Sequence, residues 1–378
     1  MSSDKVYLDN NATTPLAPEV IAEITSALNL WANPSSNNDN AKLVAEKIDQ
    51  SRQYLAQMFG AQKDGVIFTS GGTESNNWII HAAINRGGLK PPHIITTCIE
   101  HPSILEPLRI REEAGEIEVT YIPVNFDTGR VDVSTVIAAL RPNTCLVTVM
   151  LANNETGVLQ PVEEMFGLIR KSEFSPILHS DVAQAAGKLP INIDGLKADA
   201  ITVVGHKFYG PRNGAFILRP NFNIPPMIYG GNQEAGRRSG TENTPMIVGL
   251  GEAARVYLAN SEGIEQHLRE VRDYFEEQLQ VHLPTAHVVH FQTSARLPNT
   301  SSTALLNYSP HACGLVEKAQ TFSASTGAAC HKFECSPILK ACGVPFSIAS
   351  KTVRFSFGRQ TTKSQVDTVI EELKNLCA

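Results

Sequence analysis

Short apolar runs alternate with helix-like stretches along the first two-thirds of the chain. The runs are rich in β-branched residues, each leads into a polar cluster, and they occupy 65–70, 93–98, 145–151, 176–180 and 200–204. Segments of helical character lie between them, at 74–86, 102–114, 132–140 and 161–172. Strands that alternate with helices are typical of an α/β fold built around a largely parallel sheet.

A conspicuous polar residue lies on the C-terminal side of most of these runs. In chain order these residues are His101, Asn154, Asp181 and Lys207. Ligands of open α/β sheets bind outside the carboxyl ends of the strands. Any one of these residues alone is more simply explained as a cap or a loop residue, but together they are expected to converge on one crevice.

The C-terminal third of the chain has a different pattern. A charged amphipathic stretch that begins near residue 252 predicts a long helix that leaves the first domain. Three strand-like segments follow at 299–309, 322–330 and 351–358, and a final helix is predicted over 363–376. This order indicates a smaller α+β domain.

We therefore expect a large domain over 16–255 and a small domain made of 1–15 and 256–378. The N-terminal "VYLDNNATTP" is expected to pack against the small domain or to cross the interface between the two.

The composition narrows the class of protein. The 378 residues are 42% hydrophobic and 19% charged, as in an ordinary globular protein. A net charge of −6 gives no reason to expect a nucleic acid or an anionic membrane as a partner. No apolar stretch approaches the roughly 20 residues of a transmembrane helix. The N-terminus lacks a signal or transit pattern, so the cytosol is the expected location.

The cysteines indicate reduced thiols. There are seven, an odd number at irregular spacing, which argues against a disulfide framework. Small residues surround Cys330 in "SASTGAACHKFEC" and leave this thiol room to move. The pattern C-H-x3-C is formed by Cys330, His331 and Cys335. It has no second group of ligands elsewhere in the sequence and is therefore a poor zinc pattern, so we expect no metal site. Cys335 is interpreted as a packed or surface thiol.

Phosphate binding is indicated by "FTSGGTESNN", which reads as a strand, a glycine turn and a helix start. Thr73 and Glu74 occupy capping positions, and backbone N–H groups at such a start favour an anion. The motif is neither GxGxxG nor a Walker A loop. It is weak by itself, because helix capping explains most such sequences.

Lys207 can act as a nucleophile if it is buried beside other cations, since its pKa would then fall. A Schiff-base lysine, an acidic partner for a pyridinium nitrogen at Asp181 and a phosphate seat together describe pyridoxal 5′-phosphate chemistry. His101 would be free to stack on the ring. Nicotinamide binding and ATP hydrolysis do not need this set.

At these residues the sequence resembles the NifS-like group of fold-type I pyridoxal-phosphate enzymes, which contains cysteine desulfurases and selenocysteine lyases. The resemblance runs in order from about residue 6 to residue 359 through "YLDNNATTP", "FTSGGTESNN", "EHPSI", "LANNETG", "HSDVAQAAGK", "VGHKFYGPRNGA", "RRSGTENTP", "GAACH" and "VRFSFGR". It implies a large domain whose mainly parallel sheet is sandwiched by helices, a smaller α+β C-terminal domain that carries the cysteine loop, and a homodimer.

The resemblance also implies a role for individual residues. Lys207 would be joined to the cofactor, Asp181 would pair with the ring nitrogen, and His101 would stack on the ring. The other implied positions are Asn154 and Gln184 at the ring substituents, Gly72, Thr73 and His206 at the phosphate, Thr241 reaching across from a second subunit, Arg354 as the clamp on the substrate carboxylate, and Cys330 as the catalytic thiol.

Within the group, "VGHKFYGPR", "GTENTPMI", "LANNETG" and "GAACH" are most similar to the selenocysteine lyases. Bacterial-type desulfurases usually have a serine where this chain has Val204. The implied activity converts L-selenocysteine to L-alanine and passes selenium to an acceptor. Cysteine desulfurase activity with a persulfide on Cys330 is the alternative, and Pro102, where animal lyases carry an acidic residue, leaves the strictness for selenium open. A catalytically silent member of the fold and an aminotransferase are more distant alternatives; an aminotransferase would not need Cys330.

Overall fold

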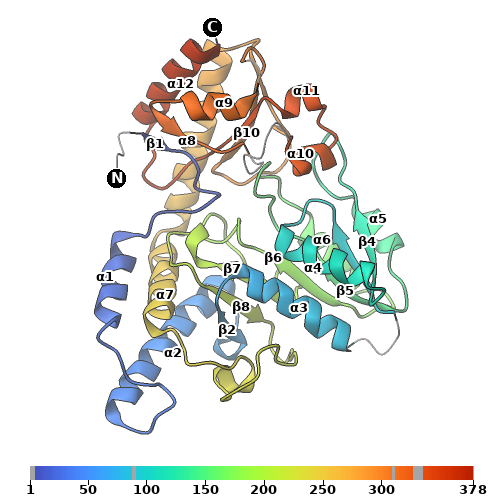
Figure 1. Ribbon diagram of the computed structural model, residues 1–378, viewed down its shortest axis with the longest axis vertical. Helices are drawn as coiled ribbons and strands as arrows, with labels where there is room; N and C mark the ends of the chain where they lie inside the picture. Colours follow the sequence, from blue (N-terminus) through green and yellow to red (C-terminus); the bar gives the residue numbers. More distant parts are fainter. Residues whose placement is uncertain (1–4, 87–90, 309–310, 327–334, 378) are drawn as a thin grey trace.

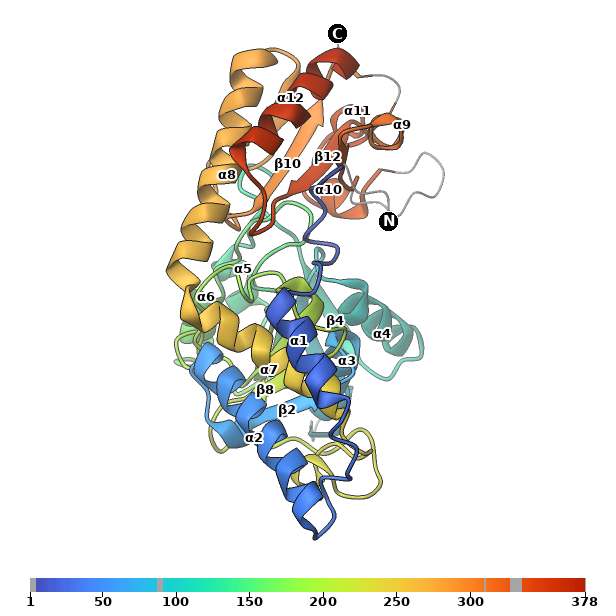
Figure 2. The same ribbon diagram turned by 90° about the vertical axis from the view of Figure 1, so that its left-hand side faces the viewer.

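The molecule has two sheet-containing regions joined by one long helix. The computed structural model describes residues 5–86, 91–308, 311–326 and 335–377. The larger region lies at the bottom of Figure 1 and the C-terminal region at the top. Figure 2 shows α8 (Ser261–His282) running along one side, from the level of the larger region up to α12 (Lys363–Cys377).

The main sheet of the larger region is predominantly parallel. In the described part of the chain it has seven strands, in the order β2-β8-β7-β6-β5-β3-β4. Only β8 runs antiparallel to its neighbours. The strands are β2 (Val66–Thr69), β3 (His93–Thr97), β4 (Glu118–Ile122), β5 (Thr144–Thr148), β6 (Ile177–Asp181), β7 (Ala200–Val204) and β8 (Gly214–Leu218). The predicted α/β fold is confirmed.

The sequence pattern missed two strands of this sheet. β4 lies at the edge and is mostly exposed or half-buried, so it lacks the apolar run that marks a buried strand. β8 follows a turn-rich segment and returns antiparallel beside β7. Its pairing depends on contacts with distant strands, which a local pattern does not encode.

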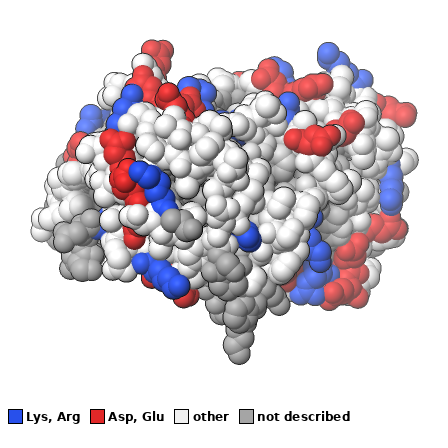
Figure 3. Space-filling view, turned by 90° about the horizontal axis from the view of Figure 1, so that it is seen from above, with Lys and Arg blue, Asp and Glu red and all other residues white. Residues whose placement is uncertain are grey.

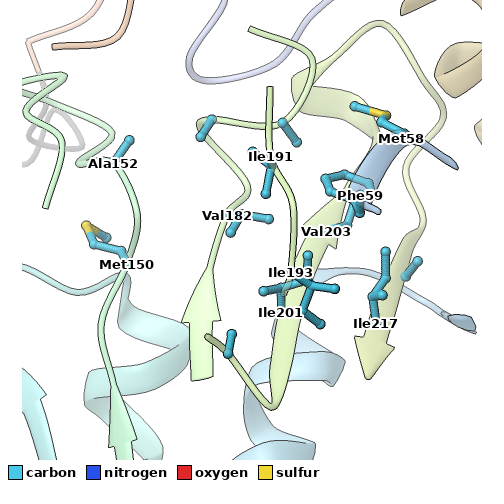
Figure 4. Close-up of a cluster of buried hydrophobic side chains, with 14 of the residues drawn as sticks. Met58, Phe59, Met150, Ala152, Val182, Ile191, Ile193, Ile201, Val203 and Ile217 are labelled. Carbon is cyan, nitrogen blue, oxygen red and sulfur yellow. The ribbon is translucent and has the colours of Figure 1, made fainter. Parts of the chain in front are cut away.

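Helices cover both faces of the main sheet. Its strands alternate between two cores, so that Phe68 packs in one and Ile67 in the other. Figure 4 shows the first core where Ile201, Val203 and Ile217 lie near Phe59. The helices of this region are α1 (Pro18–Ala27), α2 (Asp39–Phe59), α3 (Gly72–Arg86), α4 (Pro102–Glu113), α5 (Val133–Ala138), α6 (Val162–Ile169) and α7 (Thr244–Ala259).

The predicted long helix from residue 252 is wrong in one respect, because α7 and α8 are separate helices. They meet at Asn260, whose backbone is not helical (φ −154°, ψ 42°). A Cβ on Gly263 would lie only 2.4 Å from the Asn260 Oδ1, so the glycine makes room for this side chain. Asparagine favours such a break because its amide competes with helical backbone bonds.

The C-terminal region contains an antiparallel sheet and a short parallel ribbon. In the described residues the sheet order is β12 (Thr352–Ser356), β10 (Thr300–Leu305) and β9 (His287–Val289). The N-terminal strand β1 (Val6–Tyr7) pairs with β11 (Phe322–Ser323), which places the N-terminal segment on this region as expected. Short helices complete it: α9 (Ala312–Lys318), α10 (Pro337–Ala341) and α11 (Phe346–Ala349). The 3-10 turns η1 (Lys63–Gly65), η2 (Gly205–Lys207) and η3 (Glu234–Gly236) belong to the larger region.

The α8 helix contributes to both regions. Ile264 and Leu268 pack in the core of the larger region, whereas Val271 and Phe275 pack in the C-terminal core. The first turns of α8 thus pack with the larger core although they lie beyond residue 255. The division into 16–255 and 1–15 with 256–378 stays a prediction.

The surface drawn in Figure 3 carries both signs of charge. Acidic and basic side chains lie interspersed around this face, and much of its centre has neither. None of the helices in the described ranges is long and apolar enough to cross a membrane.

Candidate active site

A cavity of about 350 Å³ lies at the carboxyl ends of β5, β6 and β7. Met150 and Ala152, labelled in Figure 4, belong to the adjoining core and also line this cavity. Most of the residues singled out from the sequence line it as well: Gly72, Thr73, His101, Asn154, Asp181, Gln184, His206, Lys207 and Arg354. The predicted convergence at the strand ends is confirmed geometrically.

Lys207 lies in the η2 turn directly after β7 and is half-buried. Its Nζ donates to the backbone oxygens of Asn11, at 2.9 Å, and Ala12, at 2.8 Å. Burial and the neighbouring Arg354 guanidinium lower the pKa of Lys207 from 10.5 to about 8. The unprotonated fraction of this amine near neutral pH is therefore larger than that of an ordinary lysine, which favours Schiff-base formation.

Asp181 is the last residue of β6 and is buried. Its Oδ2 accepts from Asn76 Nδ2 at 2.8 Å, and its Oδ1 accepts from the Ala183 backbone N–H at 2.9 Å. The two hydrogen bonds fix the orientation of the carboxylate. Asp181 therefore offers an oriented acceptor to a cationic or N–H-bearing ligand in the cavity.

His101 caps the N-terminus of α4. Its Nδ1 accepts from the Ser103 backbone N–H at 3.1 Å, so the proton of the neutral ring is on Nε2. Partial burial in the cavity, assisted by nearby Lys207, lowers the pKa of His101. Pro102 occupies the first helical position, where its missing N–H leaves no helical hydrogen bond unmade.

The N-terminus of α3 faces the same cavity through Gly72 and Thr73. Orphan N–H groups and the helix dipole favour an anion at such a terminus. A Cβ on Gly72 would lie 2.6 Å from Val204 Cγ2, so the first turn of α3 packs against the end of β7 in a way that only glycine allows. His206, whose pKa burial lowers to about 4, lies nearby with Nδ1 3.0 Å from Thr13 Oγ1.

Arg354 reaches the cavity from β12 of the C-terminal sheet. Its Nη2 donates to Asp9 Oδ1 at 2.6 Å, and its Nη1 donates to the Asn154 backbone oxygen at 3.0 Å. Its Nε is buried without a hydrogen-bond partner among the described residues. A guanidinium held in this way keeps planar N–H donors available for a carboxylate.

Two buried residues that sequence reasoning missed connect these groups. Lys188 Nζ donates to Asn11 Oδ1 at 3.0 Å and to Gln184 Oε1 at 3.1 Å. Burial, reinforced by Lys207 and Arg354, holds the pKa of Lys188 well below its ordinary value. Both missed residues, Asn11 and Lys188, lie within the quoted motifs "YLDNNATTP" and "HSDVAQAAGK". Asn11 lines the cavity whereas Lys188 lies behind it, and neither follows one of the apolar runs that marked the other site residues.

Thr241 does not line this cavity. It is exposed at a second cavity of about 320 Å³, beside Arg212 and Arg238. The sequence-based prediction places Thr241 at the site of a partner subunit, and it stays a prediction.

The predicted catalytic thiol, Cys330, lies outside the described residues, as do His331 and Lys332. Cys335 is half-buried, and burial, with Glu155 nearby, raises the pKa of its thiol. Ser336 then caps α10 and donates to the buried Glu155 carboxylate.

Comparison with known proteins agrees with this geometry. The family model described as aminotransferase class-V matches residues 6–369. The chain belongs to the class-V aminotransferase family. This membership and the structural neighbours below confirm the resemblance to NifS-like enzymes.

The relatives are similar over nearly the whole chain. The chain is 43% identical to a selenocysteine lyase of Bos taurus, with 100% of this chain and 94% of the relative covered. It is 38% identical to a cysteine desulfurase of Trichormus azollae, with 98% and 92% covered. A solved NifS-like protein superposes with a TM-score of 0.90 at 29% identity, with 98% of this chain and 99% of that chain covered.

Proposed function

We propose that this protein is a pyridoxal-phosphate-dependent selenocysteine lyase, which converts L-selenocysteine to L-alanine and passes the selenium to an acceptor. The observation that carries the proposal is the convergence of Lys207, Asp181 and Arg354 on one cavity. An amine of lowered pKa, an oriented carboxylate and a guanidinium are the groups that this chemistry needs for the cofactor aldehyde, the ring nitrogen and the substrate carboxylate.

The residues around the cavity fit pyridoxal phosphate. Lys207 would hold its aldehyde carbon, Asp181 its ring nitrogen, and the α3 N-terminus with His206 its phosphate. Gly72 supports this assignment, because its missing side chain lets the first turn of α3 pack against Val204 while the turn lines the cavity, where a helix start favours an anion. Asn154 and Gln184 line the wall where ring substituents would lie.

Bound pyridoxal phosphate would supply an electron sink for the cleavage of the substrate Cα–H and Cβ–Se bonds. Arg354 would orient the amino acid through its carboxylate. The Lys207 amine, whose lowered pKa of about 8 makes its unprotonated form more accessible than that of an ordinary lysine, would accept the Cα proton. The neutral ring of His101 would lie against the cofactor without adding a second positive charge beside Lys207. Cys330 would receive or protonate the departing chalcogen.

Selenocysteine is favoured as the substrate by the relatives and by one residue. Identity is 43% to the bovine selenocysteine lyase and 38% to the cyanobacterial cysteine desulfurase. Val204 fills the cavity wall where bacterial-type desulfurases usually carry a serine. Cysteine desulfurase activity, with persulfide sulfur on Cys330, is the second candidate because desulfurases also match over nearly the full chain. A homodimer and a cytosolic location belong to this proposal.

Borohydride reduction of the cofactor-loaded protein, followed by peptide mapping, tests the covalent assignment. We expect the pyridoxyl group on Lys207 and none on Lys188, a buried lysine behind the cavity wall that serves as the matched control. Lys207→Ala should lose both the visible absorbance of the bound cofactor and all turnover. A cofactor attached elsewhere, or a colourless wild-type protein, would refute the proposal and favour a catalytically silent member of the fold.

The choice of substrate is tested by comparing kcat/KM for L-selenocysteine and L-cysteine, with alanine release as the readout of both. A higher value for selenocysteine supports the lyase. A higher value for cysteine, with persulfide found on Cys330, would assign the chain as a desulfurase.

A further inference from the structure

Asn76 lies at the junction of two groups that the proposed function uses. It is buried in the second turn of α3, with 1% of its surface exposed. Its Nδ2 donates to Asp181 Oδ2 at 2.8 Å and to Ser103 Oγ at 2.8 Å. One side-chain amide thus contacts the residue assigned to the ring nitrogen and, through Ser103, the His101 that would lie against the ring.

Asp181 decides which way this amide points. An ionised carboxylate only accepts hydrogen bonds, so the amide nitrogen of Asn76, and not its oxygen, must face Asp181. This orientation leaves Asn76 Oδ1 buried without a hydrogen-bond partner among the described residues. An unpaired buried acceptor carries a free-energy cost. The amide nitrogen of Asn76 thus donates to Asp181, although its oxygen is left without a hydrogen bond.

The second hydrogen bond extends the network to His101. Ser103 Oγ accepts from Asn76, so its own proton can point to His101 Nδ1, which lies 2.8 Å away. His101 Nδ1 also accepts from the Ser103 backbone N–H. Both contacts keep the proton of the neutral imidazole on Nε2, and the donors run in one direction, from Asn76 through Ser103 to His101.

We infer that Asn76 is a positioning residue for the cofactor ring, an inference that rests on the proposed function. It holds the Asp181 carboxylate in the orientation that binds the ring nitrogen, and through Ser103 it supports the His101 tautomer that the Ser103 backbone N–H also favours. The neighbouring Asn77 provides a matched control. It lies on the same helix, but its Nδ2 donates to the Thr73 backbone oxygen at 2.9 Å and contacts neither Asp181 nor Ser103.

The test measures cofactor binding by the full chain after its cofactor has been removed. Two ligands are compared: pyridoxal phosphate and an analogue in which carbon replaces the ring nitrogen. Asn76→Ala should weaken binding of pyridoxal phosphate by about tenfold or more, the usual effect of losing a hydrogen bond to a charged group. It should weaken binding of the carbon analogue much less, because that ring makes no contact that depends on the Asp181 orientation. Asn77→Ala should bind both ligands as wild type does.

Asn76→Asp keeps the side-chain shape and is the second test variant, to be used if Asn76→Ala does not fold. It places a second carboxylate against Asp181, so it should also weaken pyridoxal phosphate more than the analogue. Equal losses of affinity for the two ligands would show a merely structural role for Asn76. Wild-type affinity for pyridoxal phosphate in both Asn76 variants would show that Asn76 has no role. Either result overturns this inference and leaves the proposed function standing. A wild-type chain that binds no pyridoxal phosphate overturns the proposed function as well.

Discussion

Lys207 and Lys188 show how burial sets the chemistry of single residues at this site. Their described hydrogen bonds go to backbone and amide oxygens, and Lys188 forms no ion pair among the residues that the structure describes. Arg354 lies close enough to disfavour the charge of both amines. Amines that lose water and gain cationic neighbours are deprotonated more easily, which suits Lys207 to the nucleophile and general-base roles proposed for it.

The lowered pKa of Lys207 predicts a pH dependence. Only the unprotonated amine attacks an aldehyde, and its fraction rises as pH rises through a pKa of about 8. The rate at which the cofactor-free chain captures pyridoxal phosphate should therefore increase with pH and level off above that value. Stopped-flow absorbance checks this. A rate that keeps increasing toward about pH 10.4, the pKa of an ordinary lysine, would contradict it.

Cys330 predicts a separation between cofactor binding and turnover. Cys330→Ala should keep the cofactor but lose about a hundredfold or more of the rate on at least one of the two substrates, because the thiol receives or protonates the chalcogen. The half-buried Cys335 is the control, and Cys335→Ala should retain the wild-type spectrum and rates. Alanine release from L-selenocysteine and L-cysteine is the measurement. Unchanged rates on both substrates in Cys330→Ala would make this thiol a bystander.

At the scale of elements, the site depends on how α3 meets the main sheet. α3 begins at Gly72, directly after the turn that follows β2. Its start is braced by Glu74, whose carboxylate accepts from the Ser70 backbone N–H at 2.7 Å and from Arg238 Nε at 2.9 Å. The absence of a side chain at Gly72 lets the helix terminus approach Val204 at the end of β7.

Substitution of Gly72 tests this packing. In Gly72→Ala the new Cβ would meet Val204 Cγ2 at 2.6 Å, so the Val204 side chain, α3 or β7 must shift. Overpacking of this kind costs about 1–3 kcal/mol of the free energy of unfolding. The shift should also weaken cofactor binding through the displaced N–H groups.

The matched control is Gly167 in α6, where an added Cβ meets nothing within 4 Å. Gly167→Ala should stabilise the chain by about 0.5–1 kcal/mol, because alanine is the better helix former. Denaturant unfolding of both variants provides the measurement. A Gly72→Ala variant as stable as wild type would show that the two elements do not need their close approach.

On the scale of the whole molecule, the N-terminal segment joins the two regions at the cavity. Asp9 holds Arg354 of the C-terminal sheet, while the Asn11 backbone oxygen accepts from Lys207 after β7. Asn11 Nδ2 also donates to Thr300 Oγ1 at 2.8 Å. Arg354 and Lys207 are therefore placed relative to each other by a segment from the start of the chain.

Thr241 leads to a prediction about assembly. It is exposed outside the Lys207 cavity of its own chain, so a role at the cofactor requires a partner subunit. We expect a homodimer in which Thr241→Ala weakens cofactor binding by about tenfold, as for a lost hydrogen bond to phosphate. Light scattering should give twice the chain mass.

Mixed dimers test whether the residue acts across the interface. A dimer of one Thr241→Ala subunit and one Lys207→Ala subunit contains one site with both wild-type residues only if Thr241 acts in trans. Such dimers should recover wild-type cofactor affinity at half of their sites. No recovery would place the effect of Thr241 within its own chain.

Much of the site could be predicted because its residues follow apolar strands. Asp181 and Lys207 come directly after such runs, and a parallel sheet brings its strand ends to one edge. Asn76, Ser103 and Lys188 could not be predicted in the same way. Their roles depend on which polar atoms face each other inside the core, and that follows from packing between helices and strands distant in sequence.

The division at Asn260 is a similar case. The charged amphipathic pattern of α8 was visible, but the break that precedes it depends on the Asn260 side chain fitting beside Gly263.

The sequence by itself determined the α/β fold, the alternation of most strands and helices in the first two-thirds of the chain, and the residue types at the strand ends, because period, turn chemistry and motif spacing are local properties. Only the tertiary structure decided the antiparallel return of β8, the hold of Asp9 on Arg354 and the amide network around Asp181. These depend on distances between residues far apart along the chain, and the pKa of Lys207 depends on the burial and neighbouring charge that those distances create.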